Sequence, residues 1–121
     1  LDKHPMQQKI SEISIYINHH YANPLTLVQL AEQFQISPSY LSRIFKKWTG
    51  FHFKEYLQVI RIREAQKRLR ETKDSVQLIA EQVGFEHIAH FNKTFKKLTH
   101  TTPLRYRKTA MQRSKKPHLI N

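Results

Sequence analysis

The chain has 121 residues, with 21 lysines and arginines against nine aspartates and glutamates, so its formal net charge is +12. This length allows one domain or two very small lobes, and the charge points to a polyanionic partner. The chain has no cysteine, which excludes disulfides and thiolate metal sites, and no apolar run long enough to span a membrane.

The first predicted helix covers residues 6–20, after a lead-in of residues 1–5. Its apolar residues recur at the spacing of one face of an α-helix, which predicts a single buried stripe. That stripe consists of Ile10, Ile13 and Ile17. Asn23-Pro24 then ends the helix, because a residue before proline avoids the helical conformation.

A second helix is predicted to begin after Thr26, whose side chain can cap it. Gln29 stands three residues later, which is the spacing of a capping box. We therefore expect a short scaffold helix with one apolar face toward the core. The residues of that face are Leu27, Leu30, Ala31 and Phe34.

A third helix is predicted over residues 38–49, and it is the first candidate recognition helix. Ser37 is a favoured N-cap, and Pro38 suits the first helical position. Gly50 closes the helix, because glycine adopts the left-handed conformation without steric cost. Its apolar side holds Leu41, Ile44 and Phe45. Its outward side holds Ser39, Ser42, Arg43 and Lys46.

The longest uninterrupted helical pattern follows, over residues 53–70. At 1.5 Å per residue it is about 27 Å long, comparable with one turn of B-DNA, so it can hold two lobes at a fixed separation. Its inward residues are Leu57, Ile60, Ala65 and Leu69. Its basic residues are Arg61, Arg63, Lys67, Arg68 and Arg70. A solvated face and a phosphate contact explain these basic residues equally well.

Ser75 is the predicted cap of another scaffold helix, and Gly84 makes the turn after it. The expected buried residues of this helix are Val76, Ile79, Ala80 and Val83. The second candidate recognition helix covers residues 87–98. Its apolar side holds Phe91, Phe95 and Leu98. Its outward side holds Ile88, Ala89, Asn92, Lys93 and Lys96.

The end of the chain is predicted to be a short helix followed by a basic tail. Thr102-Pro103 introduces the helix, which carries Leu104, Tyr106 and Arg107. Residues 110–121 show no apolar periodicity, so we expect them to be disordered.

The second half of the chain repeats the first at an offset of 50 residues. Residues 41–56 superpose on residues 91–106 without a gap. With one extra residue in the second turn, residues 30–34 also match residues 79–83. Each copy reads as helix, turn and helix, with an alanine where the first helix must contact the second. The pattern predicts an all-α chain of about seven helices, with two helix-turn-helix subdomains at residues 6–52 and 73–109 and a connector helix at 53–72.

Several segments of the chain share the pattern of one protein family. They are LTLVQLA (25–31), SYLSRIFK (39–46), RIREA (61–65), IAEQVGF (79–85), and Phe95-Lys96-Lys97 followed by Thr102-Pro103 and Tyr106-Arg107. At these residues the chain resembles the DNA-binding domain of the AraC/XylS family of bacterial transcription regulators, with homeodomain-like lobes. A single helix-turn-helix pattern is a weak signal, whereas two in tandem at this spacing make a strong one.

The resemblance implies sequence-specific binding of double-stranded DNA, with both recognition helices in successive major grooves. The residues predicted to contact DNA, from their outward positions on these two helices, are Pro38, Ser39, Ser42, Arg43 and Lys46 in the first unit, and Ile88, Ala89, Asn92, Lys93 and Lys96 in the second. The resemblance also implies a cytoplasmic, nucleoid-associated protein that more often activates transcription, by contacting RNA polymerase, and that needs no cofactor. A sensing or dimerisation domain is expected upstream, and the first residue, Leu1, hints at a piece of a longer protein.

Three positions depart from the family pattern. His100 stands where the family usually has glycine, so the turn there forms at a cost of roughly 1 kcal/mol. His87 replaces a frequent aspartate N-cap, which predicts a weaker cap. Ala89 replaces a frequent serine and offers a base only a methyl group. These changes affect the specificity of the second unit more than its fold.

Other functions fit the sequence less well. His87 and His90 are spaced to share a helix face, but no third metal ligand is evident. No phosphate loop or nucleophilic triad is present, so the sequence does not predict an enzyme. A basic helical module that binds RNA or protein remains the alternative, and it would show little preference between cognate and random duplex. A membrane-binding role is weaker, because the apolar stripes belong to an internal core.

Overall fold

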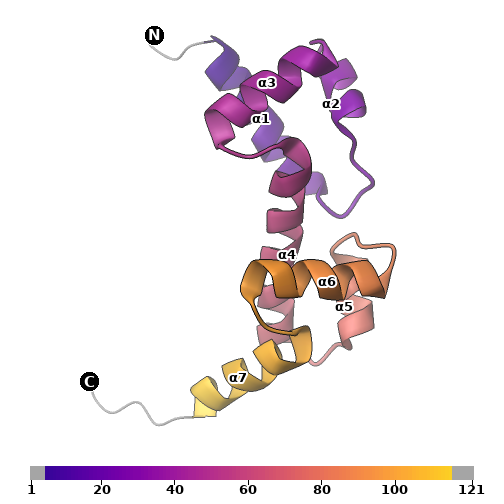
Figure 1. Cartoon of the computed structure of the whole chain (residues 1–121), viewed down its shortest axis with the longest axis vertical. Coiled ribbons are helices and arrows are strands. Elements are labelled where there is room, and N and C mark those ends of the chain that lie inside the picture. Colours follow the sequence, from indigo (N-terminus) through magenta and orange to yellow (C-terminus); the bar gives the residue numbers. More distant parts are fainter. Residues whose placement is uncertain (1–4, 116–121) are drawn as a thin grey trace, which may run out of the picture. The chain divides into compact units, whose positions relative to one another are not determined.

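The computed structural model describes residues 5–115, and its regular secondary structure in that range is α-helical (Figure 1). Its helices are α1 (Pro5–His20), α2 (Leu27–Gln33), α3 (Pro38–Thr49), α4 (Phe53–Glu71), α5 (Val76–Gln82), α6 (Ile88–Thr99) and α7 (Pro103–Lys115). The predicted all-α fold is confirmed, and every predicted helix is present. The chain divides into two compact units between Ile60 and Arg61, so α4 contributes to both.

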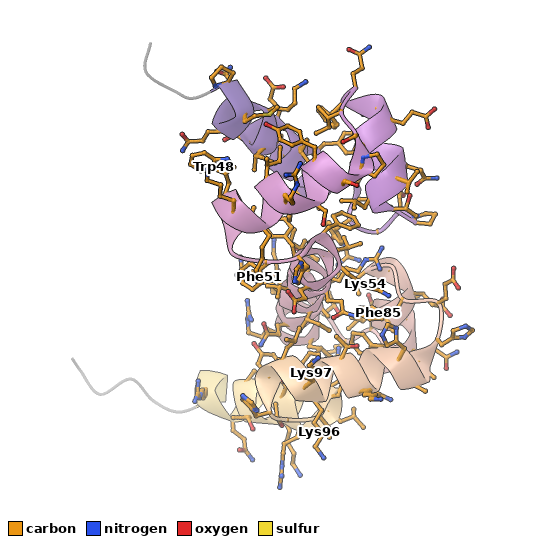
Figure 2. The ribbon with its side chains drawn as sticks, turned by 45° about the horizontal axis from the view of Figure 1, so that its top comes forward. Trp48, Phe51, Lys54, Phe85, Lys96 and Lys97 are labelled. Carbon is orange, nitrogen blue, oxygen red and sulfur yellow. The ribbon has the colours of Figure 1, made fainter. Side chains whose placement is uncertain are left out.

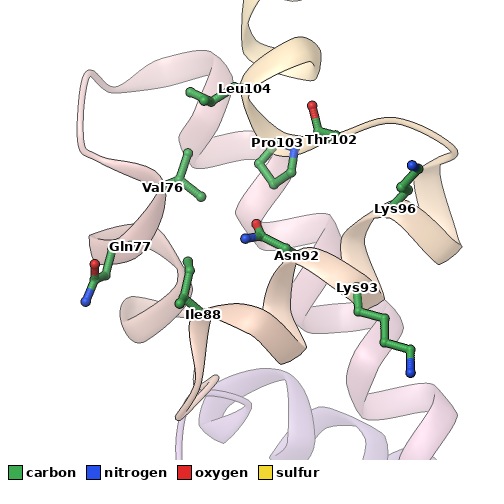
Figure 3. Close-up of a pocket in the computed structure, with 9 residues that line it drawn as sticks. All are labelled: Val76, Gln77, Ile88, Asn92, Lys93, Lys96, Thr102, Pro103 and Leu104. Carbon is green, nitrogen blue, oxygen red and sulfur yellow. The ribbon is translucent and has the colours of Figure 1, made fainter.

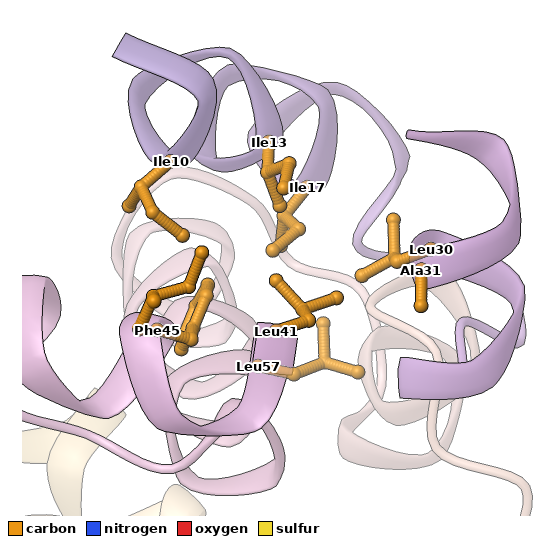
Figure 4. Packing of buried hydrophobic residues seen from close by; sticks show 9 residues of the cluster. Ile10, Ile13, Ile17, Leu30, Ala31, Leu41, Phe45 and Leu57 are labelled. Carbon is orange, nitrogen blue, oxygen red and sulfur yellow. The ribbon is translucent and has the colours of Figure 1, made fainter. Parts of the chain in front are cut away.

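The first unit is built around one apolar cluster, which Figure 4 shows from close by. Helices α1 and α2 both pack against α3, and α4 contributes one buried leucine. The labelled members are Ile10, Ile13, Ile17, Leu30, Ala31, Leu41, Phe45 and Leu57. Burying one Leu, Ile or Phe side chain stabilises a fold by about 1.5 to 3 kcal/mol, so this cluster is the main source of stability in the unit. Leu27 and Phe34, also expected there, are only half-buried.

The second unit has a core that is richer in aromatic rings. The Phe91 ring lies 5.2 Å from the Phe85 ring at 74° and 5.7 Å from the Phe95 ring. The Phe95 ring in turn meets Tyr106 edge to face at 5.8 Å. Such edge contacts stabilise beyond the area they bury. The buried apolar residues of this unit are Ile62, Ala65, Leu69, Ile79, Ala80, Val83, Phe85, Phe91 and Phe95.

Three details of the predicted apolar faces differ in the structure. Leu98, predicted on the buried side of α6, is 38% exposed. Thr94 takes the buried place instead, at 5% exposure, where the first unit has Ile44. In α4, Ile62 is buried at 2% exposure although the sequence does not predict it. Val76, expected to be buried, is half-buried.

Side-chain caps begin the helices where the sequence predicts them. The backbone N–H of Gln29 donates to Thr26 Oγ1 at 3.1 Å, that of Tyr40 to Ser37 Oγ at 3.2 Å, and that of Leu78 to Ser75 Oγ at 3.1 Å. Each bond satisfies a donor that the first helical turn leaves unpaired. The predicted caps at Thr26, Ser37 and Ser75 are therefore confirmed.

The internal repeat is visible in the hydrogen bonds of the turns. The N–H of Ile36 donates to the carbonyl of Ala31 at 2.9 Å, and that of Phe85 donates to Ala80 at the same distance. At the last residue of each recognition helix, a threonine hydroxyl lies within hydrogen-bond reach of the carbonyl four residues earlier. This distance is 2.7 Å from Thr49 and 2.8 Å from Thr99. The two units therefore share local geometry as well as sequence.

Both recognition helices end in the left-handed conformation, although only one ends in glycine. Gly50 has φ +83°, and His100 has φ +64° and ψ +19°. The expectation that His100 adopts this conformation is thus confirmed. A Cβ added at Gly50 would meet no atom within 4 Å, so steric crowding there comes only from the local backbone. Gln35 is a further residue at positive φ, +60°, which the sequence does not flag.

Exchanging the residues at these two helix ends should have opposite effects on stability. We expect His100→Gly to stabilise the chain by about 0.5 to 1 kcal/mol, because relief of left-handed strain exceeds the added entropy of the unfolded glycine. Gly50→Ala should destabilise it by about 1 kcal/mol for the converse reason. Urea unfolding followed by circular dichroism measures both changes. A loss of stability in His100→Gly would contradict the strain argument.

The C-terminal helix is longer than the sequence predicts. It continues to Lys115, so the prediction of a disordered tail is wrong for residues 110–115. Residues 116–121 lie outside the described residues. Arg107 ties the helix to the end of α4: its Nε donates to the Leu69 carbonyl at 3.0 Å and its Nη2 to the Thr72 carbonyl at 3.2 Å. This arginine therefore caps α4 from a distance.

Part of the basic side of α4 is occupied by contacts within the second unit. Arg68 Nη1 donates to Gln82 Oε1 at 2.9 Å, and its Nε lies 3.4 Å from Glu64 Oε2. The Arg61 guanidinium lies 5.9 Å from the Phe85 ring centre, and its burial lowers its pKa. The contacts of Arg61 and Arg68 stabilise the second unit. Arg63 and Lys67, in contrast, are exposed, and no such contact explains their charge. Within residues 5–115, no helix combines the length and the apolar character that a membrane crossing needs.

Candidate nucleic-acid interface

Helix α3 presents its predicted outward residues to solvent. Pro38, Ser39, Arg43 and Lys46 are exposed, and Ser42 is half-buried. The Arg43 guanidinium lies over the Tyr40 ring, 5.4 Å from its centre, which restrains the side chain without neutralising its charge. Lys46 Nζ donates to the Gly50 carbonyl at 3.0 Å, so this lysine also supports the end of the helix. Of the two cations on this face, Arg43 is therefore the one whose hydrogen-bond donors remain available to a ligand.

Helix α6 presents the second set of predicted residues, and all of them are exposed. Four of these five lie together beside a hollow of about 620 Å³, which Figure 3 shows; Ala89 does not line it. The lining residues come from α6, from the first turns of α5 and α7, and from the loop just before α7. They are Val76, Gln77, Ile88, Asn92, Lys93, Lys96, Thr102, Pro103 and Leu104.

The hollow beside α6 combines an apolar wall with a cationic rim. Val76, Ile88 and Leu104 lie around it, and Leu104 is 67% exposed. Asn92 points toward its centre, whereas the Lys93 side chain extends away from it (Figure 3). The sequence misses the parts that α5 and α7 contribute, because it assigns Val76 to the core and gives Leu104 no role. No sequence signal identifies these parts, because they depend on how α5 and α7 pack beside α6.

The beginning of α6 lacks the side-chain cap that α3 has. His87 occupies the N-cap position with extended backbone angles but makes no capping hydrogen bond, which confirms the predicted weaker cap. The ring of His90 packs against the edge of Phe85 at 5.3 Å. Among the residues that the structure describes, no three His, Asp or Glu side chains are grouped so as to hold a metal ion.

The two recognition helices carry the same charge. Each contains three basic residues and no acidic one: Arg43, Lys46 and Lys47 in α3, and Lys93, Lys96 and Lys97 in α6. Lys96 and Lys97, which Figure 2 labels on α6, are both exposed. A face with one sign of charge concentrates polyanions near it and steers their approach. Each recognition helix therefore has a basic exposed face and an apolar face that packs in the core.

Comparison with known proteins decides the family. A family model described as a helix-turn-helix domain matches residues 30–109. The computed structure matches a crystal structure of a transcriptional regulator from Chromobacterium violaceum described as containing an AraC-type DNA-binding domain, with a TM-score of 0.81 and 26% identity over 88% of this chain and 96% of that one. The chain belongs to the AraC-type helix-turn-helix family. The resemblance found in the sequence is thereby confirmed.

Two further relatives extend the comparison. A Bacillus subtilis protein, the uncharacterized HTH-type transcriptional regulator YtdP, is 40% identical over 101 residues, which cover 83% of this chain but only 13% of that protein. The DNA-binding domain of AdpA, solved in complex with a target DNA, has a TM-score of 0.84 over 89% of this chain and 97% of that one. Its identity of 22% supports the shared fold alone. The AraC-type family is one of DNA-binding regulator domains and not of enzymes.

Proposed function

We propose that this AraC-type domain binds double-stranded DNA in a sequence-specific way, with α3 and α6 each inserted into a major groove. The observation that carries the proposal is the pair of recognition helices, each with an acid-free basic face over a buried apolar one. A major groove admits one α-helix, and its base edges are read by side chains on the exposed face. The DNA in the AdpA complex is consistent with this use of the fold.

The proposed base-reading and phosphate-binding residues are those predicted from the sequence. They are Pro38, Ser39, Ser42, Arg43 and Lys46 on α3, and Ile88, Ala89, Asn92, Lys93 and Lys96 on α6. Val76, Gln77, Thr102 and Leu104 join the second set, because they line the same hollow as Ile88 and Asn92. Selection of bound duplexes from a random pool, followed by footprinting, tests the proposal. Equal binding to selected duplex, random duplex and an RNA hairpin would favour the alternative, a basic module without DNA specificity.

The role of the whole protein is a further proposal. This chain spans 13% of the length of its YtdP relative, so most of such a regulator lies outside it. We propose a bacterial transcription activator that acts in the cytoplasm on the nucleoid, with a sensing or dimerisation domain upstream and a contact to RNA polymerase. The support is the AraC-type family itself, in which activation is common. Transcription in vitro with the full-length regulator, its selected site and RNA polymerase tests activation directly.

In the first unit, replacement of Arg43 should remove a base contact. Arginine matches the O6 and N7 atoms of guanine with two parallel hydrogen bonds, so Arg43→Ala should cost about 1 to 3 kcal/mol on the preferred site and relax the preference at one or two base pairs. Arg43→Lys is the matched control, because it keeps the charge and loses the paired geometry. Equal weakening on every sequence, with rescue by lysine, would instead make Arg43 a phosphate contact.

The second unit should contribute more to the affinity for DNA than to the preference between base pairs. Ile88 and Ala89 can pack on a thymine methyl group and Asn92 can bond an adenine edge, but none matches an arginine–guanine pair. Lys93 and Lys96 supply charge without sequence information. Measuring affinity for every single base-pair change in a selected site should therefore show the sharpest preferences in the half-site of α3. The sharpest preferences in the other half-site would contradict this assignment.

A further inference from the structure

A second hollow lies away from the recognition helix, between the end of α4 and the outer side of α7. Its volume is about 460 Å³, and it shares no lining residue with the hollow beside α6. The polar residues that line it are Arg70, Thr101, Arg105, Tyr106, Thr109 and Arg113. They come from α4, from the loop before α7 and from α7 itself. The sequence leaves a phosphate contact open for Arg70 and gives Arg105 and Arg113 no role in a site of this kind.

The charge around this second hollow is uncompensated. All three of its charged lining residues are arginines, and no carboxylate lines it. Within residues 5–115, no ion pair joins Arg70, Arg105 or Arg113 to an acid. Arg105 and Arg113 are eight residues apart on one helix, which places them about 12 Å apart along its axis and on neighbouring faces. Their mutual repulsion is weak at this separation, but three positive charges around one hollow attract an anion.

Hydroxyl groups add uncharged donors to the same hollow. Arg70 Nη1 donates to the Tyr106 hydroxyl oxygen at 2.6 Å, so the phenolic proton is left to donate elsewhere. Thr101 Oγ1 is buried and has no hydrogen-bond partner among the described residues. Buried hydroxyl groups are nearly always paired, which makes this one an exception that asks for a partner. The hollow is thus rich in donors and poor in charged acceptors.

We propose that this second hollow binds a phosphate group. Arginine forms paired hydrogen bonds with phosphate as readily as with carboxylate. The donors here, however, come from three segments of the chain, which suits a tetrahedral group with several acceptor oxygens better than a planar carboxylate with two. The phosphate has two possible sources: a free phosphorylated small molecule, or a backbone phosphate of DNA that flanks the site read by the recognition helices. The first source does not depend on the proposed function, and the second rests on it.

The main test compares two variants that each lose two positive charges. R105Q/R113Q removes charge from the hollow, whereas K73Q/K108Q removes it from exposed lysines that line neither hollow. Binding of inorganic pyrophosphate is measured by calorimetry, with glutarate as the dicarboxylate control. If a free ligand is the source, R105Q/R113Q should bind pyrophosphate at least tenfold more weakly than K73Q/K108Q. Glutarate should bind weakly to both variants.

The DNA source is tested with the same pair of variants on two duplexes, a selected site without flanks and one with ten more base pairs on each side. If backbone phosphate is the source, the flanked duplex should lose at least tenfold more affinity in R105Q/R113Q than in K73Q/K108Q. The unflanked duplex should lose the same affinity in both variants. Failure of the wild-type chain to bind either duplex would overturn the proposed function without touching the pyrophosphate result.

Thr101→Val separates a ligand contact from a packing defect, because it removes the buried hydroxyl and keeps the shape of the side chain. We expect the melting temperature without ligand to stay the same or rise, and the affinity for the bound phosphate source to fall about tenfold. If the phosphate affinity of this variant is unchanged, Thr101 does not contact the phosphate, and the proposed set of donors is wrong. Equal behaviour of R105Q/R113Q and K73Q/K108Q in both arms, or tighter binding of glutarate than of pyrophosphate, would overturn the phosphate site.

Discussion

Replacing Phe91 with alanine should destabilise the second unit by about 3 to 5 kcal/mol. The Phe91 side chain is fully buried, and its ring contacts those of Phe85 and Phe95. Its removal leaves a cavity among aromatic groups that cannot collapse without breaking their edge contacts. A unit of this size holds only a few kcal/mol of stability in all, so the variant should be largely unfolded there at 25 °C. Amide hydrogen exchange, resolved by residue, measures the loss.

The matched control for Phe91→Ala is Leu98→Ala on the same helix. Leu98 is 38% exposed, so its truncation should cost less than about 1 kcal/mol. The two residues were predicted to share one buried face, and the pair therefore tests the corrected face of α6. A loss at Leu98 as large as that at Phe91 would show that the exposed leucine packs more closely than its exposure indicates.

The sequence predicts most of the fold because helix periodicity, caps and the internal repeat all point to the same elements. Ser37 and His87 are 50 residues apart and begin equivalent helices, while Thr26 and Ser75 are 49 apart, as the extra residue in the second turn requires. Glycine is not needed at the left-handed end of α6, because histidine tolerates that conformation. Agreement between these independent local signals is what makes the predicted topology secure.

The errors arise where periodicity alone cannot choose between neighbouring residues. In α6, Leu98 is more apolar than Thr94, and hydrophobicity therefore selects the wrong one. The repeat contained the correction, because Ile44 on the predicted buried side of the first copy superposes on Thr94. Leu98 superposes on Trp48, which was not predicted to be buried and is 37% exposed. In α4, Leu57 belongs to the cluster of the first unit and Ile62 is buried in the second, so no single stripe describes the helix.

The candidate interface was only partly predictable from the sequence. The outward residues of α3 and α6 follow from the helix spacing once the buried side is known, and the structure places nine of the ten in exposed positions, with Ser42 half-buried. The contributions of Val76 and Leu104 depend on how α5 and α7 pack beside α6, which is tertiary information. The sequence also did not predict the extension of α7 to Lys115, because a polar helix without an apolar stripe resembles a disordered tail in sequence.

Binding to DNA should fall steeply with salt, and this is the largest effect we expect on function. If the faces of α3 and α6 neutralise six to eight phosphates, the logarithm of affinity should fall with the logarithm of salt concentration with a slope of about −5 to −7. Raising the salt from 100 to 300 mM would then weaken binding about 200- to 2,000-fold. The physical cause is the release of condensed counterions by the basic side chains of both helices. Titrations at four or more salt concentrations measure the slope.

Single substitutions show where on the surface the slope originates. Lys96→Ala should make the slope shallower by about one, because Lys96 is exposed on the proposed DNA face of α6. Lys73→Ala removes the same charge from an exposed position that lines neither hollow, so it should leave the slope unchanged. A wild-type slope shallower than about −2 would place most of the charge of +12 away from the DNA. In that case the two recognition helices together would neutralise no more than about two phosphates, too few for both to be inserted in major grooves as proposed.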